Sequence, residues 1–228
     1  MKLNKLRQAI ATLTLLGTAA SSHAALISAG EFPISGTGLG SVNTLVTLES
    51  NNSTGIASGS VTRTAGEDAI TGDAKKGEKS SSTFTFDFLN VTKASDLLFI
   101  FNANEPSGNE ISLDSLVLSI FSATDEVLFT ASLAGSVFFP ETFEGTGKSG
   151  FGFRLDDTDA ALAQQFIIGA NRIGLEFGVS QATGGIDSFF VIGLDEGGGG
   201  ENEVPEPASI ALLGLGIAGL FAARRRKA

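Results

Sequence analysis

The chain has 228 residues and a formal net charge of −10 at pH 7, from 15 basic and 25 acidic side chains. It contains no Cys, Trp or Tyr, and its only His is His23. The absence of Cys excludes disulfides and cysteine nucleophiles. The acidic balance excludes nucleic-acid binding, which needs positive charge against the phosphate backbone.

The N-terminal residues have the pattern of a secretory signal peptide. An apolar stretch spans residues 9–20, and small residues follow it at positions 22–24. Three basic residues precede the stretch: Lys2, Lys5 and Arg7. This order predicts a signal peptide over residues 1–24, cut by signal peptidase between Ala24 and Ala25. Because His23 would leave with it, a Ser-His-Asp triad and the usual zinc sites are excluded from the mature chain.

Residues 25–196 are predicted to form one secreted domain that consists mainly of strands. Residues 25–203 keep eight basic and 24 acidic residues, a net charge of −16. Short β-prone runs alternate with turn residues, which favours an all-β antiparallel sandwich or jelly roll. We expect the Gly-rich residues 25–40 to form a leader with at most an edge strand. Runs 42–48 and 56–62 are expected to form a hairpin, and residues 83–88 a strand with three Phe on one face.

Two segments depart from the strand pattern. Residues 64–82 have few apolar side chains and mixed charges, which predicts a long mobile loop. Residues 158–167 are rich in helix formers and follow acidic capping residues. They predict one short helix that packs Leu162 and Phe166 on a sheet.

The C-terminal residues combine three features in a fixed order. A Gly-rich linker is predicted over residues 197–203 and leads into Val204, Pro205, Glu206 and Pro207. Residues 208–223 follow as an uncharged apolar run, which at about 1.5 Å per residue reaches roughly 24 Å as a helix. A basic cluster then ends the chain: Arg224, Arg225, Arg226 and Lys227. We predict a transmembrane helix over residues 208–223, with the basic cluster on the cytoplasmic side.

This C-terminal segment, residues 204–228, resembles the PEP-CTERM sorting signal of Gram-negative bacteria. The resemblance implies that Pro205, Glu206 and Pro207 are recognised by an exosortase, a membrane-embedded cysteine transpeptidase. It also implies export across the inner membrane, a membrane-anchored, cell-surface or extracellular location, and an association with exopolysaccharide. A plain C-terminal membrane anchor is the alternative interpretation of the same residues.

Acidic side chains offer the candidate metal ligands. Asp156, Asp157 and Asp159 form the densest cluster, and carboxylate oxygens suit Ca²⁺. Acids in the first turn of a helix are equally explained by the helix dipole. Further possible ligands are Asp187, Asp114 and the loop that holds Asn102, Asn104 and Glu105. We expect no other cofactor.

Catalysis is not expected. A glycosidase needs two carboxylates across a sugar cleft, and the available ones are Glu105, Glu110, Glu141, Glu144 and Glu176. All 18 aromatic residues are Phe, so Trp and Tyr are absent as sugar-stacking platforms. The sequence therefore favours an exported envelope or extracellular-matrix structural protein. The alternative is a glycan- or calcium-binding module on the cell surface.

Overall fold

The computed structural model describes seven stretches of the chain: residues 25–33, 42–49, 55–77, 80–105, 110–140, 149–183 and 185–194. The predicted signal peptide, linker and C-terminal sorting segment lie outside these residues. Among the residues that the structure describes, no helix has the length and apolar character needed to cross a membrane. The predicted transmembrane helix at 208–223 is not among those residues.

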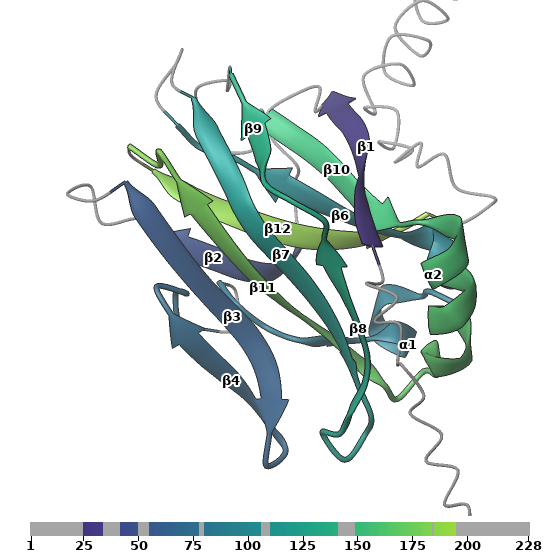
Figure 1. Ribbon diagram of the computed structural model, residues 1–228. Coiled ribbons are helices and arrows are strands. Elements are labelled where there is room, and N and C mark those ends of the chain that lie inside the picture. Colours follow the sequence, from purple (N-terminus) through teal and green to yellow (C-terminus); the bar gives the residue numbers. More distant parts are fainter. Residues whose placement is uncertain are drawn as a thin grey trace, which may run out of the picture.

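The described residues fold mainly into strands, which confirms the all-β prediction (Figure 1). The strands are β1 (Ala25–Pro33), β2 (Asn43–Glu49), β3 (Ile56–Thr64), β4 (Glu67–Gly72), β5 (Phe84–Thr85), β6 (Leu97–Asn102), β7 (Ile111–Phe121), β8 (Val127–Leu133), β9 (Val137–Phe139), β10 (Ser149–Leu155), β11 (Arg172–Ser180) and β12 (Ile186–Gly193). The helices are α1 (Phe86–Leu89) and α2 (Asp157–Ala163), with 3₁₀ turns η1 (Ala94–Asp96) and η2 (Gln164–Phe166).

These strands form one curled sheet instead of the two separate sheets of the predicted sandwich. Its strand order is β2-β12-β6-β10-β1-β8-β7-β11-β3-β4, and β5 and β9 pair off this path with β11 and β7. The curl brings the half that contains β6 face to face with the half that contains β11. The ring centroids of Phe101 in β6 and Phe177 in β11 are 6.0 Å apart. The architecture is therefore sandwich-like in packing but continuous in hydrogen bonding.

Strand β1 joins the two halves of the sheet. It runs antiparallel to β10, from Leu26 opposite Leu155 to Pro33 opposite Ser149, and parallel to β8 at Ala25 and Leu26. The expectation of a leader with at most an edge strand is therefore wrong. A register shift between Ser28 and Gly30, whose φ is 91°, interrupts the regular pairing of β1 with β10.

The predicted loop over residues 64–82 is also wrong in its first part. Strand β4 pairs with β3 across a two-residue turn, Ala65-Gly66, whose φ values are 53° and 84°. Positive φ at both turn positions matches the twist of a tight hairpin. The residues after β4 then run beside β2: the N–H groups of Lys75 and Ser82 donate to the carbonyls of Thr47 and Leu45. The predicted hairpin between residues 42–48 and 56–62 is wrong. Strand β2 pairs with β12, and strand β3 pairs with β11 and β4.

Both helices begin at side-chain caps. The predicted strand over residues 83–88 stops after β5, because the Thr85 hydroxyl accepts the Phe88 N–H at 3.2 Å and starts α1. This turn buries Phe86 but leaves Phe88 65% exposed. The predicted helix at 158–167 is confirmed as α2 followed by η2. Leu162, expected to be packed, is 45% exposed, whereas Phe166 lies against Phe129.

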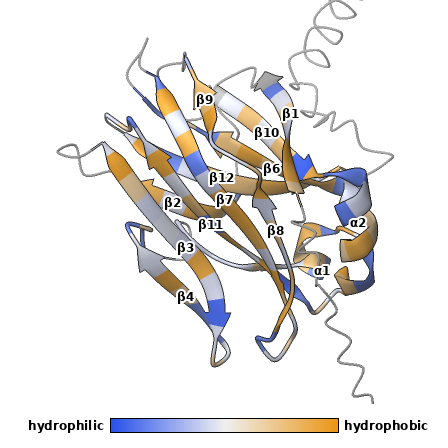
Figure 2. Cartoon of the chain, viewed as in Figure 1, coloured by the Kyte–Doolittle hydropathy of each residue, from blue (hydrophilic) through white to orange (hydrophobic). Residues whose placement is uncertain are grey.

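Phenylalanine rings fill the space between the two halves of the sheet. Phe101, Phe177 and Phe189 are fully buried, and the Phe189 ring lies 5.0 Å from Phe101 and 4.8 Å from Phe177. Hydrophobic residues are frequent along the strands that enclose the space between the two halves of the sheet (Figure 2). Burying one such side chain contributes about 2 to 3 kcal/mol, so the core is stabilised by packing in a chain that has no Cys.

Candidate functional site

The three aspartates of the predicted calcium cluster lie at the start of α2, but each has a different partner. The Asp156 carboxylate caps the helix by accepting the Asp159 N–H at 2.8 Å. Asp157 forms an exposed ion pair with Arg154 at 3.1 Å. The buried Asp159 carboxylate accepts the N–H of Ala25 at 2.5 Å. In the described stretches no group of three or more His, Cys, Asp or Glu is placed to hold a metal ion, and calcium at these residues stays a prediction.

Two other carboxylic side chains are enclosed at one end of the β6–β12 pair. Glu105 follows β6 and is 1% exposed, and Asp187 lies in β12 and is 0% exposed. They are neighbours because β12 pairs with β6, with Ser188 opposite Asn102. The Asp187 Oδ1 accepts the Asn104 N–H at 3.0 Å. Two 2.8 Å hydrogen bonds reach the Glu105 Oε2 from the N–H and hydroxyl of Thr183.

The electrostatics of this pair are unfavourable. Burial raises the pKa of Asp187 to about 7; the Asn104 N–H lowers it, and the negative charge of Glu105 raises it further. The Asp187 Oδ2 is buried and has no hydrogen-bond partner among the described residues. A proton or a cation beside Oδ2 would relieve both the repulsion and the unsatisfied oxygen. We call Glu105 and Asp187 the acidic pair.

The predicted secondary calcium ligands separate into two groups. Asn102, Asn104, Glu105 and Asp187 lie at the same end of the β6–β12 pair, whereas Asp114 is exposed on β7. The sequence signal that could have ranked Asp187 above the α2 aspartates is its place inside an apolar run, residues 186–192. An acid within a strand that is otherwise buried is unusual unless it has a partner.

The glutamates considered for a glycosidase do not share one environment. Glu105 is enclosed and bound to Thr183, whereas Glu110 is exposed and accepts a hydrogen bond from Gln181 at 2.7 Å. Glu176 is exposed on β11, and Glu141 and Glu144 lie outside the described residues. The three glutamates that the structure describes therefore do not form a shared site, and the absence of catalysis stays a prediction.

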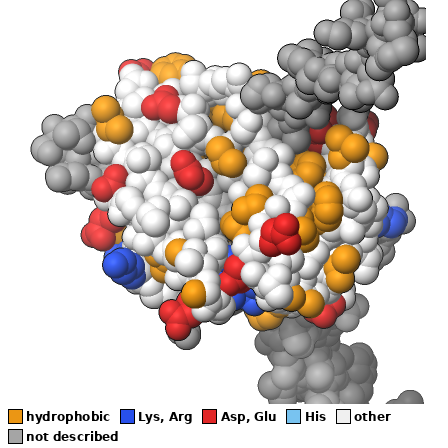
Figure 3. Space-filling model, turned by 60° about the horizontal axis from the view of Figure 1, so that its bottom comes forward, with side chains coloured by type: hydrophobic (Ala, Val, Ile, Leu, Met, Phe, Trp, Pro, Cys, Tyr) orange, Lys and Arg blue, Asp and Glu red, His pale blue; other side chains and the backbone are white. Residues whose placement is uncertain are grey.

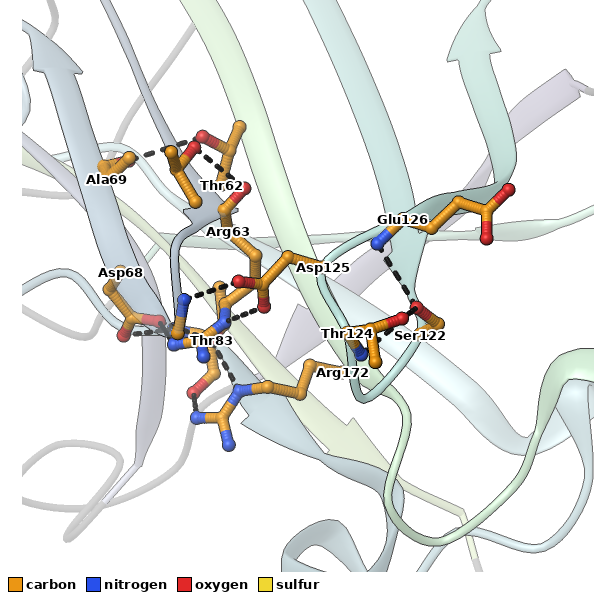
Figure 4. A network of polar contacts seen from close by, with 12 residues as sticks. Thr62, Arg63, Asp68, Ala69, Thr83, Ser122, Thr124, Asp125, Glu126 and Arg172 are labelled. Atoms are coloured by element: carbon orange, nitrogen blue, oxygen red, sulfur yellow. Dashed lines mark hydrogen bonds and ion pairs between the residues drawn. The ribbon is translucent and has the colours of Figure 1, made fainter.

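A third polar cluster, which sequence reasoning missed, connects four segments of the chain (Figure 4). Arg63 at the end of β3 forms ion pairs with Asp68 of β4 at 2.9 Å and with Asp125 of the β7–β8 turn at 3.0 Å. Arg172 at the start of β11 donates to the hydroxyl and carbonyl of Thr83, and that hydroxyl donates to Asp68. We call these five residues the arginine network.

The contacts within the arginine network stabilise the charged forms of Arg63 and Asp68. Burial opposes the charge of Asp68, but hydrogen bonds from Thr83 and Arg63 outweigh it and hold the Asp68 pKa below its usual value. Burial also opposes the charge of Arg63, yet hydrogen bonds and charge from Asp68 and Asp125 raise its pKa. The guanidinium groups of Arg63 and Arg172 connect the β3–β4 hairpin, Thr83, the β7–β8 turn and β11, so the network stabilises the fold.

The surface of the described residues has two shallow grooves beside α2. The larger, about 440 Å³, lies between β8 and the α2–η2 segment, where Val127, Leu162 and Phe166 line it. The smaller, about 310 Å³, lies between η1 and α2. No Glu lines either groove. On the face shown in Figure 3, acidic side chains lie singly, Lys and Arg are few, and apolar side chains gather on one side.

The described residues thus define an all-β protein. Its arginine network and the aspartates of α2 form contacts within the fold. A family model described as a PEP-CTERM protein-sorting motif matches residues 203–227. The chain therefore carries this motif, as Val204, Pro205, Glu206 and Pro207 predicted, and the motif implies export, membrane-associated sorting and processing by an exosortase. No curated protein and no solved structure matches the chain.

Proposed function

We propose that the chain is a non-catalytic structural protein of the cell envelope or extracellular matrix, associated with exopolysaccharide. The observation that carries this proposal is the PEP-CTERM motif at residues 203–227, placed after a domain built by strand packing. The arginine network and the α2 aspartates are used within the fold, which supports a scaffold more than a catalyst. The association with exopolysaccharide rests on the family resemblance.

The sorting part of this proposal is tested by intact-mass measurement of the protein from envelope and medium fractions of its native host. We expect a chain that begins at Ala25 and ends near Pro207. Replacing Glu206 by Ala should leave residues 208–228 attached, because it removes the charge between the two prolines. Glu201→Ala is the matched control, since it removes the same charge outside the matched motif. Retention of Arg224–Ala228 in the wild-type chain would make the tail a plain anchor.

The matrix part is tested by deleting the gene and measuring matrix cohesion and polysaccharide yield together. A scaffold predicts lower cohesion at unchanged yield, restored by the wild-type gene. Shortened polysaccharide chains in the presence of the purified protein would instead indicate an enzyme. Unchanged cohesion in the deletion strain would contradict a structural role.

A calcium-binding module is the second candidate, and the acidic pair favours it. The buried Oδ2 of Asp187 and the neighbouring Glu105 offer oxygen ligands of the kind that Ca²⁺ prefers. A ligand that binds only the folded state raises its stability, by about 2.7 kcal/mol at 100 times Kd. Added calcium should therefore raise the melting temperature of the wild type and of Asp114→Asn, but not of Asp187→Asn. Equal shifts in all three proteins would refute calcium binding at the acidic pair.

A further inference from the structure

The first residue of the predicted mature chain is held at both of its backbone polar groups. The Ala25 N–H donates to the Asp159 carboxylate at 2.5 Å, and the Ala25 carbonyl accepts the Asp156 N–H at 3.1 Å. Asp159 is 4% exposed. In the part of the chain that the structure describes, no Lys or Arg forms an ion pair with it. A buried carboxylate thus faces the one backbone nitrogen that signal-peptide cleavage would change.

Cleavage converts this contact from a hydrogen bond into an ion pair. Water adds across the Ala24–Ala25 peptide bond, Ala24 leaves with the new carboxylate, and the Ala25 nitrogen becomes an amine that takes up a proton. Free α-amino groups are mostly protonated at neutral pH. We propose that Asp159 is the binding site for the α-ammonium group of Ala25 that signal peptidase generates.

The burial of Asp159 makes the charge of its partner important for the stability of the fold. A carboxylate removed from water is unfavourable when its only partner is a neutral N–H, and it becomes tolerable when a cation with good geometry faces it. Ala25 is only partly buried, so its ammonium group keeps some hydration. The short distance and the second bond to Asp156 fix the nitrogen in place, which lowers the entropy lost when the charged pair forms.

The position of the pair in the fold gives it a role in maturation. Ala25 is the first residue of β1, the strand that joins the two halves of the sheet. In the precursor the same nitrogen is an uncharged amide, so its contact with Asp159 is a hydrogen bond, which is weaker than the ion pair. The precursor is therefore the less stable form, and cleavage after translocation strengthens the fold at its junction.

This inference rests on the proposed export and on cleavage after Ala24, and its test separates the two. The mature protein is purified from the host fraction that contains it, as wild type and with Gly-Ser inserted between Ala24 and Ala25. The insertion leaves every side chain in place but moves the ammonium group two residues away from Asp159. Both proteins are also made with Asp159→Asn, and intact mass identifies each N-terminus.

We expect the insertion to lower the melting temperature of the wild type by several °C, because it breaks a partly buried ion pair. In Asp159→Asn the insertion should shift the melting temperature by less than about 1 °C, since no charge faces the nitrogen. Asp157→Asn is the matched control: it removes an exposed carboxylate from the same helical turn and should keep the full effect of the insertion.

Two results would overturn the inference in different ways. A wild-type chain that does not begin at Ala25 removes the predicted ammonium group, while the sorting motif at the other end is unaffected. A chain that begins at Ala25 but melts at the same temperature with and without the insertion shows that cleavage is correct and the ion pair is not formed. If Asp159→Asn does not fold, the insertion alone still decides, because it changes no residue of the fold.

Discussion

Replacing Asp187 by Asn should remove a large pH dependence of stability. The wild-type carboxyl has a pKa of about 7 in the folded protein against 3.8 for an ordinary Asp, which corresponds to roughly 4 kcal/mol. Because the folded state holds the proton more tightly, this group stabilises the fold below pH 3.8, and that contribution is lost as the pH rises to about 7. Between pH 5 and pH 7.5 the loss is roughly 2 to 3 kcal/mol.

The substituted asparagine side chain would resemble the protonated carboxyl and would not titrate. The assay is urea unfolding of the purified mature chain at pH 5 and pH 7.5, with a chelator present so that no divalent cation is bound. Asp187→Asn should gain roughly 2 to 3 kcal/mol relative to the wild type between the two pH values. Asp114→Asn removes an exposed carboxylate and should track the wild type. Parallel pH profiles for the wild type and Asp187→Asn would refute the electrostatics derived for the acidic pair.

Three further substitutions, two of them with a matched control, test the core packing, the arginine network and a glycine turn by the same unfolding assay. Phe101→Ala empties a fully buried ring site and should cost about 3 to 5 kcal/mol, whereas Phe88→Ala on the surface should cost less than about 1 kcal/mol. Arg63→Ala removes the cation that binds both Asp68 and Asp125 and should cost more stability than Arg154→Ala, whose pair is exposed and should cost less than about 1 kcal/mol. Gly185→Ala should cost about 2 kcal/mol, because φ is 112° and a Cβ would overlap a backbone carbonyl. Equal costs within either matched pair, or a neutral Gly185→Ala, would contradict these contacts.

Periodicity predicted which segments are strands better than it predicted which strands pair. Alternating apolar residues over 113–121 correctly indicated β7, and the acidic cap correctly indicated α2. The pairing of β2 with β12 could not be predicted, because alternation fixes the face of a strand and contains no information about its neighbour. A β2–β3 hairpin was therefore the simplest prediction for two runs separated by a turn.

The departures at β1 and α1 have a different origin. Residues 25–33 have too few large apolar side chains to predict a strand, and β1 forms because pairing with both β10 and β8 satisfies its backbone. At α1 the Thr85 cap outweighs the strand pattern of the three phenylalanines.

Candidate sites made of consecutive residues could be predicted from the sequence, whereas those made of distant residues could not. Local sequence identified the sorting motif, because all of its parts are consecutive, and the family model matches it at residues 203–227. The acidic pair joins Glu105 and Asp187, which are 82 positions apart in the chain, and only strand pairing reveals that they are neighbours. The α2 aspartates looked like a cluster because they are adjacent in sequence, yet their side chains turn to separate partners.

The segment that runs beside β2 has a consequence for self-association. An uncovered outer strand presents a row of free N–H and C=O groups that can template another chain and lead to fibrils. Here the N–H groups of Lys75 and Ser82 occupy the carbonyls of Thr47 and Leu45, and β4 at the other border of the sheet has six residues, two of them acidic. Both borders of the described sheet thus discourage growth by strand addition. Copies at high local concentration would therefore stay separately folded, and contacts between them would use faces and loops instead of strand edges.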